Sequence, residues 1–343
     1  MTIKDIAREA GYAVGTVSRV LNHRPDVSEE ARQKIMAVVE KHHFQLNNNA
    51  KHLKQQTSTG IALVVKGTQN MLCAALVEAL QGLIKSKGYA CLIYYIDEDD
   101  NEVSQALQIL RERRPQGILF LGSTLRNFRE AFAAVEVPCV MVTNSAQELD
   151  FANLSSISTD DAAAARFAME HLMALGHRNI GILGGKMERS PAACARYQGC
   201  IEAFRKAGVP FDSQRQYESA RFAMDSGAAA MDRLLDKFPD ITAVFAMSDV
   251  MAVGAIRAIR DRGLRVPEDI SIMGFDGIAL GQYLDPRLTT IEQNAALIAR
   301  RSVEQLLGCI EDHRPPVHEV VPYRLVEGGS VRPLPAAKGR EMA

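Results

Sequence analysis

Residues 3–22 read IKDIAREAGYAVGTVSRVLN, two short amphipathic patterns on either side of a glycine. The first pattern sets four apolar side chains on one face of a helix, at positions Ile3, Ile6, Ala7 and Ala10. Thr2 precedes it as an N-cap, because its hydroxyl can accept a hydrogen bond from a free amide of the first turn. Gly11 follows it, and glycine adopts the backbone angles of a sharp turn at little cost. The stretch therefore predicts two helices joined by a tight turn.

A second and a third helix complete the predicted N-terminal module. The second has an apolar side and a small or polar side, formed respectively by Val14, Val17 and Leu21, and by Gly15, Thr16 and Arg19. The third is opened by Ser28 and turns inward Ala31, Ile35 and Val38. Three short helices with a glycine turn between the first two form the helix-turn-helix arrangement. Its second helix would present its polar side to the major groove of DNA, and a small helical cap without a role on DNA is the alternative.

The charge of the chain is unevenly distributed. The 343 residues contain 40 Lys and Arg and 41 Asp and Glu, a net charge of −1, which by itself argues against a nucleic-acid partner. Residues 1–60 carry nine basic and six acidic side chains, a charge of +3, and the remaining 283 residues carry 31 basic and 35 acidic side chains, a charge of −4. This asymmetry is compatible with a small basic DNA reader on a larger neutral body.

Composition and motifs exclude several classes of protein. Hydrophobic residues make up 47% and charged residues 24% of the chain, which is typical of globular domains rather than fibres or disordered chains. The start has no apolar stretch of a secretory signal, and no apolar run approaches a membrane span, so we expect a cytoplasmic protein without a membrane partner. The six cysteines include no C-x-x-C pair, which favours reduced core thiols. We expect no metal and no cofactor.

The N-terminal sequence resembles the headpiece of the lactose/galactose-repressor family of bacterial transcription regulators. The matching strings, all in register, are Asp5-Ile6-Ala7, Ala10-Gly11 and Thr16-Val17-Ser18-Arg19-Val20-Leu21-Asn22. The resemblance implies a recognition helix that begins near Ala13, where the family usually has Ser or Thr, and base-reading positions at Val14 and Gly15. The other DNA contacts that it implies in this module are Thr2, Thr16, Ser18, Arg19 and Asn22. Because Gly15 has no side chain, the preferred operator should differ from that of relatives with a long polar residue there.

Residues 46–53, LNNNAKHL, match the hinge of the same family, which reads Pro-Asn-x-x-Ala-Arg-x-Leu. In relatives the hinge folds into a helix on the operator and its leucine wedges into the minor groove, a role that falls to Leu53. Ala50 would let two hinge helices pack closely, and Lys51, in place of arginine, would meet phosphate without bidentate geometry. Asn47 and Lys54 complete the DNA contacts implied for this segment.

Beyond residue 59, short apolar runs alternate with helical patterns. We expect strands at 61–65, 90–95, 117–121, 139–142, 180–183, 243–247 and 270–273, and helices near 73–87 and 103–113. This alternation predicts an α/β fold of parallel sheets with helices on both faces. Leu80-Gln81-Gly82 and Tyr197-Gln198-Gly199 form a faint internal repeat that two similar lobes would explain. A ligand would then bind between the lobes, near the carboxyl ends of the strands.

The family resemblance covers essentially residues 2–330. Its further strings include Leu175-Gly176-His177-Arg178-Asn179-Ile180, Ser248-Asp249-Val250-Met251-Ala252, Val266-Pro267-Glu268-Asp269-Ile270-Ser271 and Leu288-Thr289-Thr290-Ile291. It implies a headpiece at 1–46, a hinge helix and linker at 47–58, a two-lobed ligand-binding and dimerisation core like that of periplasmic binding proteins at 59–330, and a tail at 331–343. Lobe 1 would comprise about 60–160 and 291–320, and lobe 2 about 161–290 and 321–330.

The resemblance also implies five ligand-binding residues. Arg196 lies in an Arg-x-x-Gly string whose arginine holds ligand oxygens, and a guanidinium suits paired hydroxyls or a carboxylate. Asp276 follows an expected buried strand and can accept hydrogen bonds from two sugar hydroxyls. Phe222 matches an aromatic position, Asp249 matches the edge of the cleft, and Asn70 is the single match in the loop after the first strand. The alternatives are a surface ion pair for Arg196, a loop cap for Asp276 and core packing for Phe222.

The loop after the first strand departs from the family pattern. Relatives usually have Pro-Asp-x-x-Asn-Pro-Phe-Phe, whereas residues 66–73 read KGTQNMLC. Both aromatic residues that often flank the ligand are missing, and Lys66 has appeared. Lys66 would meet an anionic ligand, such as a sugar phosphate, or be solvated. The expected effector is sugar-like, and its charge stays open.

These observations predict a regulator and not an enzyme. We expect a homodimeric repressor on a palindromic operator in double-stranded DNA, with a small molecule between the lobes as inducer or co-repressor. The expected dimer faces are 72–83 and 250–258, and the tail lacks the apolar heptads of a tetramer-forming coiled coil. A sugar-binding receptor of the same shape would need a signal peptide. A sugar-modifying enzyme would need a catalytic pair, and no H-E-x-x-H or G-x-S-x-G motif is present.

Overall fold

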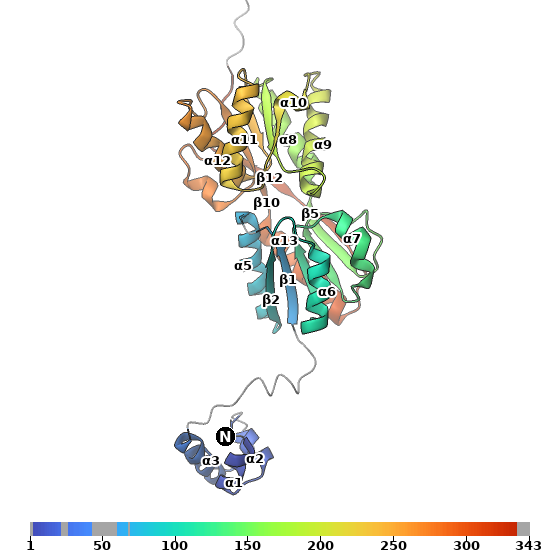
Figure 1. The fold of residues 1–343 in the computed structure, drawn as a ribbon, viewed down its shortest axis with the longest axis vertical. Coiled ribbons are helices and arrows are strands. Elements are labelled where there is room, and N and C mark those ends of the chain that lie inside the picture. Colours follow the sequence, from blue (N-terminus) through green and yellow to red (C-terminus); the bar gives the residue numbers. More distant parts are fainter. Residues whose placement is uncertain (1–2, 22–26, 43–59, 68, 335–343) are drawn as a thin grey trace, which may run out of the picture. The chain divides into compact units, whose positions relative to one another are not determined.

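The computed structural model of the protein describes residues 3–21, 27–42, 60–67 and 69–334. The chain forms two compact units, Met1–Ser58 and Thr59–Ala343. The first is the helical headpiece and the second is a core of two α/β lobes (Figure 1). Together they confirm the predicted fold class. Within the described residues, no helix is long and apolar enough to cross a membrane.

The headpiece consists of three short helices, α1 (Ile3–Ala10), α2 (Val14–Leu21) and α3 (Glu29–Lys41). Its small core brings together two apolar residues from each helix, namely Ile6, Ala7, Val17, Val20, Ile35 and Val39. Gly11 has a φ of 73°, a left-handed conformation that lets the chain turn sharply between α1 and α2. The Ser28 hydroxyl accepts a hydrogen bond from the Ala31 amide and caps α3.

The apolar side of α2 differs from the prediction. Val14 is 40% exposed, whereas Val20 is 1% exposed and packs inside with Val17. Val14 is the first residue of α2 and does not belong to the apolar cluster of the headpiece. In α3, Val39 is similarly more buried than the predicted Val38. The exposed side of α2 thus begins with an apolar side chain.

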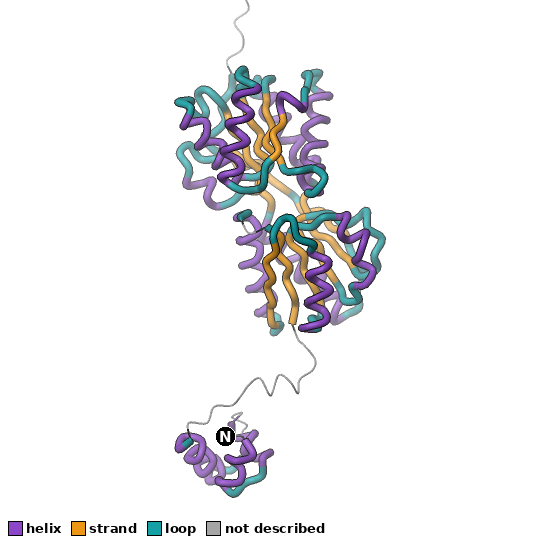
Figure 2. Tube along the Cα trace, viewed as in Figure 1, coloured by secondary structure: helices purple, strands orange, loops and turns teal. Residues whose placement is uncertain are grey.

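Lobe 1 is a six-stranded parallel sheet covered by helices. Its strands, in the order β11-β5-β4-β3-β1-β2, include β1 (Gly60–Lys66), β2 (Ala90–Ile96), β3 (Gly117–Leu121), β4 (Cys139–Thr143), β5 (Leu154–Thr159) and β11 (His318–Val321). Its helices are α5 (Met71–Ser86), α6 (Glu102–Arg113), α7 (Leu125–Ala131) and α13 (Ala295–Glu311). Strand β1 lies inside the sheet and is apolar on both faces, as expected where helices cover both sides (Figure 2).

Lobe 2 repeats the same plan. Its strands, in the order β12-β10-β9-β8-β6-β7, are β6 (Ile180–Gly184), β7 (Tyr217–Ser219), β8 (Ala243–Ala246), β9 (Ser271–Asp276), β10 (Thr289–Gln293) and β12 (Tyr323–Val326). Its helices are α8 (Asp161–Ala174), α9 (Pro191–Lys206), α10 (Ser213–Gln216), α11 (Met224–Lys237) and α12 (Asp249–Asp261). Only β12 runs antiparallel to its neighbour. The repeated Gln-Gly strings fall on α5 and α9, which each follow the first strand of their lobe.

The chain passes between the two lobes three times. It crosses from β5 to α8, from β10 to α13, and from β11 to β12. Each lobe is therefore discontinuous in sequence, and the carboxyl ends of strands from both lobes meet where the chain crosses. Val250 and Ile278 of lobe 2 pack within the apolar cluster of lobe 1, so the two lobes also share a contact.

Candidate functional site

A cavity lies between the lobes at the carboxyl ends of their strands. It has roughly 1120 Å³ of free space counted out to its open mouth, enough for a small-molecule ligand. Lobe 1 lines it with residues after β1, β2, β3 and β4, among them Lys66, Asn70, Cys73, Asp99, Ser123, Thr124 and Asn144. Lobe 2 lines it with residues from β9, β10, α9 and the loops after β6 and β7, among them Arg189, Arg196, Arg221, Phe222, Asp276 and Gln293.

Asp276, at the end of β9, is buried at the inner end of this cavity. Its two carboxylate oxygens accept hydrogen bonds of 2.8 Å from the Ser248 hydroxyl and the Gln293 amide. Burial raises the pKa of Asp276 to about 6, although the nearby Arg196 favours the charged form. Asp276 has a φ of 119°, and Thr143 across the cavity has a φ of 73°. Such strained conformations of non-glycine residues concentrate at functional sites.

Arg196, on α9, is the buried cation of the cavity. Its Nε donates a 2.7 Å hydrogen bond to Asp161 Oδ1, and its Nη1 donates to the Met247 carbonyl and lies 3.8 Å from Asp276 Oδ1. The guanidinium stacks on Phe275, with 3.7 Å from Cζ to the ring centroid. Its burial excludes the alternative of a surface ion pair. Arg196 is thus held rigidly beside Asp276, as a site for paired ligand oxygens requires.

Phe222 and Asn70 also line the cavity. A Cβ atom on Gly185 would lie 2.9 Å from the Phe222 ring, so the glycine after β6 leaves room for that ring. Phe222 also packs against both apolar clusters of lobe 2. It therefore lines the cavity and belongs to the packing of the core at the same time. The side-chain oxygen of Asn70 accepts a 2.9 Å hydrogen bond from the Leu72 amide and caps α5. Phe222 and Asn70 are thus parts of the cavity wall, and the fold fixes their positions.

Asp249 is not among the residues that line the cavity. It is fully buried behind Asp276, and its oxygens accept hydrogen bonds from the Thr290 hydroxyl at 2.5 Å and the Ile278 amide at 2.8 Å. Burial, together with the charge of Asp276, raises the pKa of Asp249 to about 8. The structure therefore gives Asp249 a different place from the predicted ligand contact. Its carboxylate fixes the loop that follows Asp276.

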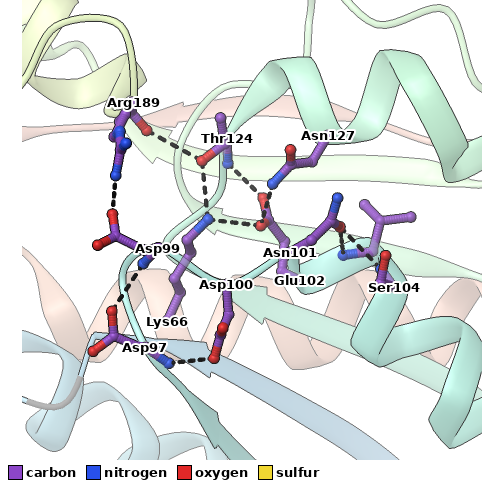
Figure 3. A network of polar contacts seen from close by, with 11 residues as sticks. Lys66, Asp97, Asp99, Asp100, Asn101, Glu102, Ser104, Thr124, Asn127 and Arg189 are labelled. Atoms are coloured by element: carbon purple, nitrogen blue, oxygen red, sulfur yellow. Dashed lines mark hydrogen bonds and ion pairs between the residues drawn. The ribbon is translucent and has the colours of Figure 1, made fainter.

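Lys66 is paired inside lobe 1. Its Nζ donates hydrogen bonds to Glu102 Oε2 at 2.8 Å and to Thr124 Oγ1 at 3.1 Å (Figure 3). Glu102 is fully buried and also accepts from the Thr124 amide at 2.6 Å and the Asn127 side chain at 2.8 Å. The Lys66 side chain is only 9% exposed. It is thus neither solvated nor an unpaired cation awaiting an anionic ligand.

Two cavity residues that the sequence reasoning missed carry unpaired polar atoms. Within the described residues, Ser123 Oγ and Gln293 Oε1 are buried without a hydrogen-bond partner. The side-chain NH2 group of Gln293 donates a hydrogen bond to Asp276, which leaves the side-chain oxygen of Gln293 free to accept one from a ligand. Both residues end or follow a strand, like Asp276. The signal that singled out Asp276 would have found them too, had it been applied to every strand end.

The predicted DNA-binding residues of α2 lie on one side of the headpiece. Ala13, Val14, Gly15 and Arg19 are exposed, and Thr16 and Ser18 are partly exposed. The Ala13 carbonyl accepts from the Thr16 and Val17 amides, so Ala13 is the residue at which the chain enters α2. The other predicted DNA contacts lie outside the described residues, namely Thr2, Asn22, Asn47, Ala50, Lys51, Leu53 and Lys54.

The two predicted dimer faces differ in exposure. Helix α5 exposes the side chains of Met71, Ala74, Ala75 and Glu78 along one side. In the segment 250–258 of α12, Arg257 is exposed and Val253 partly so, and the other residues are buried within the chain. Within the described residues, no group of three His, Cys, Asp or Glu side chains is placed to hold a metal ion.

Comparison with known families assigns both parts of the chain. Residues 2–47 match the family of bacterial regulatory proteins named lacI, and residues 169–331 match a periplasmic binding protein-like domain. The transcriptional regulator MalR of Clostridium butyricum is 32% identical over 333 residues, which cover 96% of this chain and 99% of the relative. The ribose operon repressor of Haemophilus influenzae is 34% identical over 311 residues, which cover 91% of this chain and 92% of the relative.

A solved structure shows the same similarity. The lac repressor dimer bound to operator and the anti-inducer ONPF has a TM-score of 0.79 and 26% identity, covering 97% of this chain and 99% of that chain. These relatives are regulators of transcription, which confirms the prediction of a regulator and not an enzyme. Since the identity exceeds 30% over nearly the full length of both chains, this protein belongs to the lacI family of bacterial regulatory proteins.

Proposed function

We propose that this protein is a repressor that binds a palindromic operator as a homodimer and responds to a sugar-like molecule in the cavity between its lobes. The observation that carries the proposal is that one chain combines an exposed candidate recognition helix with a cavity between two lobes, and that the inner end of this cavity holds Arg196 and Asp276. Since it acts on operator DNA, the proposal places the protein in the bacterial cytoplasm.

On DNA, α2 enters the major groove, with Val14 and Gly15 facing the base edges and Arg19 facing a guanine or a phosphate. Val14 supports this role because it stays exposed although it is apolar. Leu53 in the hinge wedges into the minor groove. Two N-terminal segments, each with a charge of +3, add their phosphate contacts on one duplex, and the exposed side of α5 pairs the two chains.

The buried charges of the cavity favour an uncharged effector, although the exposed Lys186 also lines it. Arg196 already faces the carboxylates of Asp161 and Asp276, and Lys66 faces that of Glu102. A ligand anion would have to compete with these carboxylates for the same cations in a poorly solvated site. A hydroxyl-rich sugar instead pairs with Arg196 and Asp276 without adding charge. A relative that is named a ribose operon repressor suggests ribose as the first probe.

Ligand and operator influence each other's affinity reciprocally through the core. A molecule that contacts both walls of the cavity favours one relative orientation of the lobes. The three chain crossings join the lobes side by side, so reorientation shifts the end of lobe 1 from which the hinge emerges at β1. The spacing of two hinges in the dimer then decides whether both headpieces reach one operator.

Operator binding by the full chain tests the DNA half of the proposal. Selection from a random DNA library, followed by fluorescence anisotropy, should yield a palindromic site. Leu53→Ala should weaken binding to that site at least tenfold, a loss of about 1.4 kcal/mol. Gln55→Ala, two residues further along the same segment, should leave the affinity within a factor of two. A non-palindromic site, or equal affinities of both variants, would refute the operator mechanism.

A thermal-shift screen of the full chain with ribose, other neutral sugars and their phosphates tests the ligand half. We expect a neutral sugar to raise the melting temperature and to change operator affinity, and the matching phosphate to have a smaller effect. Removal of residues 1–58 should abolish operator binding and keep the sugar shift. A sugar that binds equally well to Phe222→Ala would show that the cavity is not its site.

A further inference from the structure

Charged side chains from both lobes meet across the cavity. Asp97, Glu98 and Asp99 follow β2 in lobe 1, whereas Arg189 follows β6 and Arg221 follows β7 in lobe 2. Asp99 Oδ2 accepts a 2.8 Å hydrogen bond from Arg221 Nη2, and Asp99 Oδ1 pairs with Arg189 Nη1. Arg221 also lies 3.7 Å from Asp97 Oδ1 and 3.7 Å from Glu98 Oε2. Asp99 therefore joins two arginines of the opposite lobe at once.

This contact stands at the solvent end of the cavity. Asp99, Arg189 and Arg221 line the same cavity as Arg196 and Asp276. The side chains of Asp99, Arg189 and Arg221 are 51%, 59% and 52% exposed, whereas those of Arg196 and Asp276 are 6% and 1% exposed. The exposed ion pairs are thus at the mouth, and the proposed ligand contacts lie behind them.

Hydrogen bonds within lobe 1 hold the turn that carries Asp99. Asp99 and Asp97 each donate a backbone amide to a neighbouring carboxylate of the same turn, and Asn101 caps α6 directly after it (Figure 3). The next residue is Glu102, buried and paired with Lys66. Thr124, which Glu102 and Lys66 hold in place, has its hydroxyl 3.1 Å from the Arg189 carbonyl. The turn is therefore a rigid support, and Arg189 is held through both its side chain and its backbone.

We propose that Asp99, Arg189 and Arg221 form an electrostatic clasp that closes the lobes over the cavity and must open before a ligand enters or leaves. The clasp rests on the proposed function only in that the cavity is taken as the effector site. Exposed ion pairs contribute little each and are weakened by salt, so the clasp keeps the cavity closed most of the time without locking it. Effector exchange is then controlled by ionic strength as well as by effector concentration.

The labelling rate of a native cysteine, Cys73, can report on opening of the cavity. Cys73, on α5, lines the cavity, and burial raises the pKa of its thiol to about 12, so it reacts slowly while the lobes are closed. Cys139 and Cys200 are fully buried in the cores of lobe 1 and lobe 2 and react only if a lobe unfolds. Labelling of the full chain with methyl methanethiosulfonate, followed by peptide mass spectrometry, gives all three rates in one sample. No sugar and no DNA are added.

We expect Asp99→Asn to raise the labelling rate of Cys73 about two- to tenfold at low salt, with Cys139 and Cys200 unchanged. High salt should produce the same rise in the unaltered protein and no further rise in Asp99→Asn. In a background with Arg189→Gln and Arg221→Gln, the same Asp99→Asn change should have no further effect. Glu136→Gln is the control, because it removes one negative charge from an exposed position of lobe 1 that does not line the cavity, and its rate should stay that of the unaltered protein.

The clasp would be refuted if Asp99→Asn left the labelling rate of Cys73 unchanged, or if Glu136→Gln raised it equally. A rise that persisted in the double arginine background would also refute it, since Asp99 would then act through other partners. Failure of the proposed function has a different signature. In that case the sugar and operator experiments fail while the labelling rates still depend on Asp99 and on salt.

Discussion

Lys66 Nζ lies 2.8 Å from Glu102 Oε2, and the Glu102 side chain is fully buried. The pair joins the end of β1 to the first turn of α6, and Glu102 extends it through hydrogen bonds to Thr124 and Asn127. A buried ion pair is a weak source of net stability, but either partner alone leaves an uncompensated charge. Lys66, for which the sequence left open an anion contact or a solvated side chain, therefore shapes the cavity wall from within lobe 1.

Lys66→Met should destabilise the core strongly. The buried Glu102 carboxylate would lose its cation, which costs about 3–5 kcal/mol in free energy of unfolding. Urea unfolding followed by circular dichroism measures this loss. Adding Glu102→Gln to Lys66→Met should restore much of the stability, because the buried charge is then gone. Lys186→Met changes an exposed lysine of the same cavity and should stay within about 0.5 kcal/mol of the parent. A mild Lys66→Met variant would contradict the importance of the pair.

Ser123→Ala should preserve or increase stability and reduce ligand binding. The Ser123 hydroxyl lines the cavity without a partner among the described residues, so its removal breaks no hydrogen bond of the described chain. Ser302→Ala is the control, because Ser302 is equally unpaired and buried on α13, away from the cavity. Both variants should unfold at the same or a higher urea concentration. Only Ser123→Ala should lose the thermal shift produced by the sugar from the screen. Lower stability of Ser123→Ala alone would assign its hydroxyl a structural partner instead.

Stability of the core should fall as the pH rises towards about 8. The pKa of Asp249 is raised by burial from 3.8 to about 8, so between these values the folded state holds a proton that the unfolded state has released. Such a group increases the free energy of unfolding at low pH. This contribution is lost as the pH rises, at up to about 1.4 kcal/mol per pH unit. The buried Asp276, with its pKa raised to about 6, adds to the same trend. Urea unfolding over this range measures the slope.

Asp249→Asn should flatten this pH dependence, because asparagine does not titrate. Asp150→Asn, at an exposed position, should leave the slope unchanged. If the slope of Asp249→Asn equalled that of the parent protein, Asp249 would be ionised throughout the range. The stability of Asp249→Asn at low pH reports separately on the two hydrogen bonds that Asp249 accepts, from the Ile278 amide and the Thr290 hydroxyl, because asparagine keeps only one acceptor oxygen.

Two glycines of the headpiece should respond oppositely to alanine. Gly15 lies in α2 with open space where a Cβ would be, so Gly15→Ala should stabilise the helix by about 0.5–1 kcal/mol. Gly11 has a φ of 73°, so Gly11→Ala should destabilise the turn by a similar amount or more. Hydrogen exchange of α2 amides in the full chain should slow about two- to fivefold in Gly15→Ala and accelerate in Gly11→Ala. Equal effects would contradict the assigned turn.

Local patterns in the sequence predicted much of the fold. The strand at 117–121 agrees with β3 residue for residue, and those near 61–65 and 180–183 differ from β1 and β6 by one or two residues. These strands are continuous apolar runs because parallel sheets are covered on both faces. Gly11 and Ser28 marked the headpiece turn and cap correctly, since both depend only on residues close by in the sequence. Val14 was misjudged because burial depends on where the core ends, and periodicity does not show that.

The resemblance led to four residues that line the cavity, Asn70, Arg196, Phe222 and Asp276, but the roles of other residues required coordinates. Asp249 was predicted as a ligand contact because it matches the edge of the family's cleft, whereas in the structure it is fully buried and does not line the cavity. Ser123 and Gln293 carry no distinctive motif, and their importance lies in buried atoms without partners. Which polar atoms are satisfied is a property of the packed chain and not of a string.

The sequence alone determined the family, the α/β class and the helix-turn-helix headpiece, because these depend on local periodicity, on turn residues and on motifs read in order. Tertiary structure alone decided that Lys66 is neutralised by Glu102, 36 positions away, and that Asp99 meets Arg189 and Arg221, 90 and 122 positions away. The interaction energy of two charges decreases with their distance in space and does not depend on their separation along the chain. The folding of lobe 1 brings the first pair together, and the crossings between the lobes bring Asp99 to the two arginines. Both decide which charges are available to a ligand.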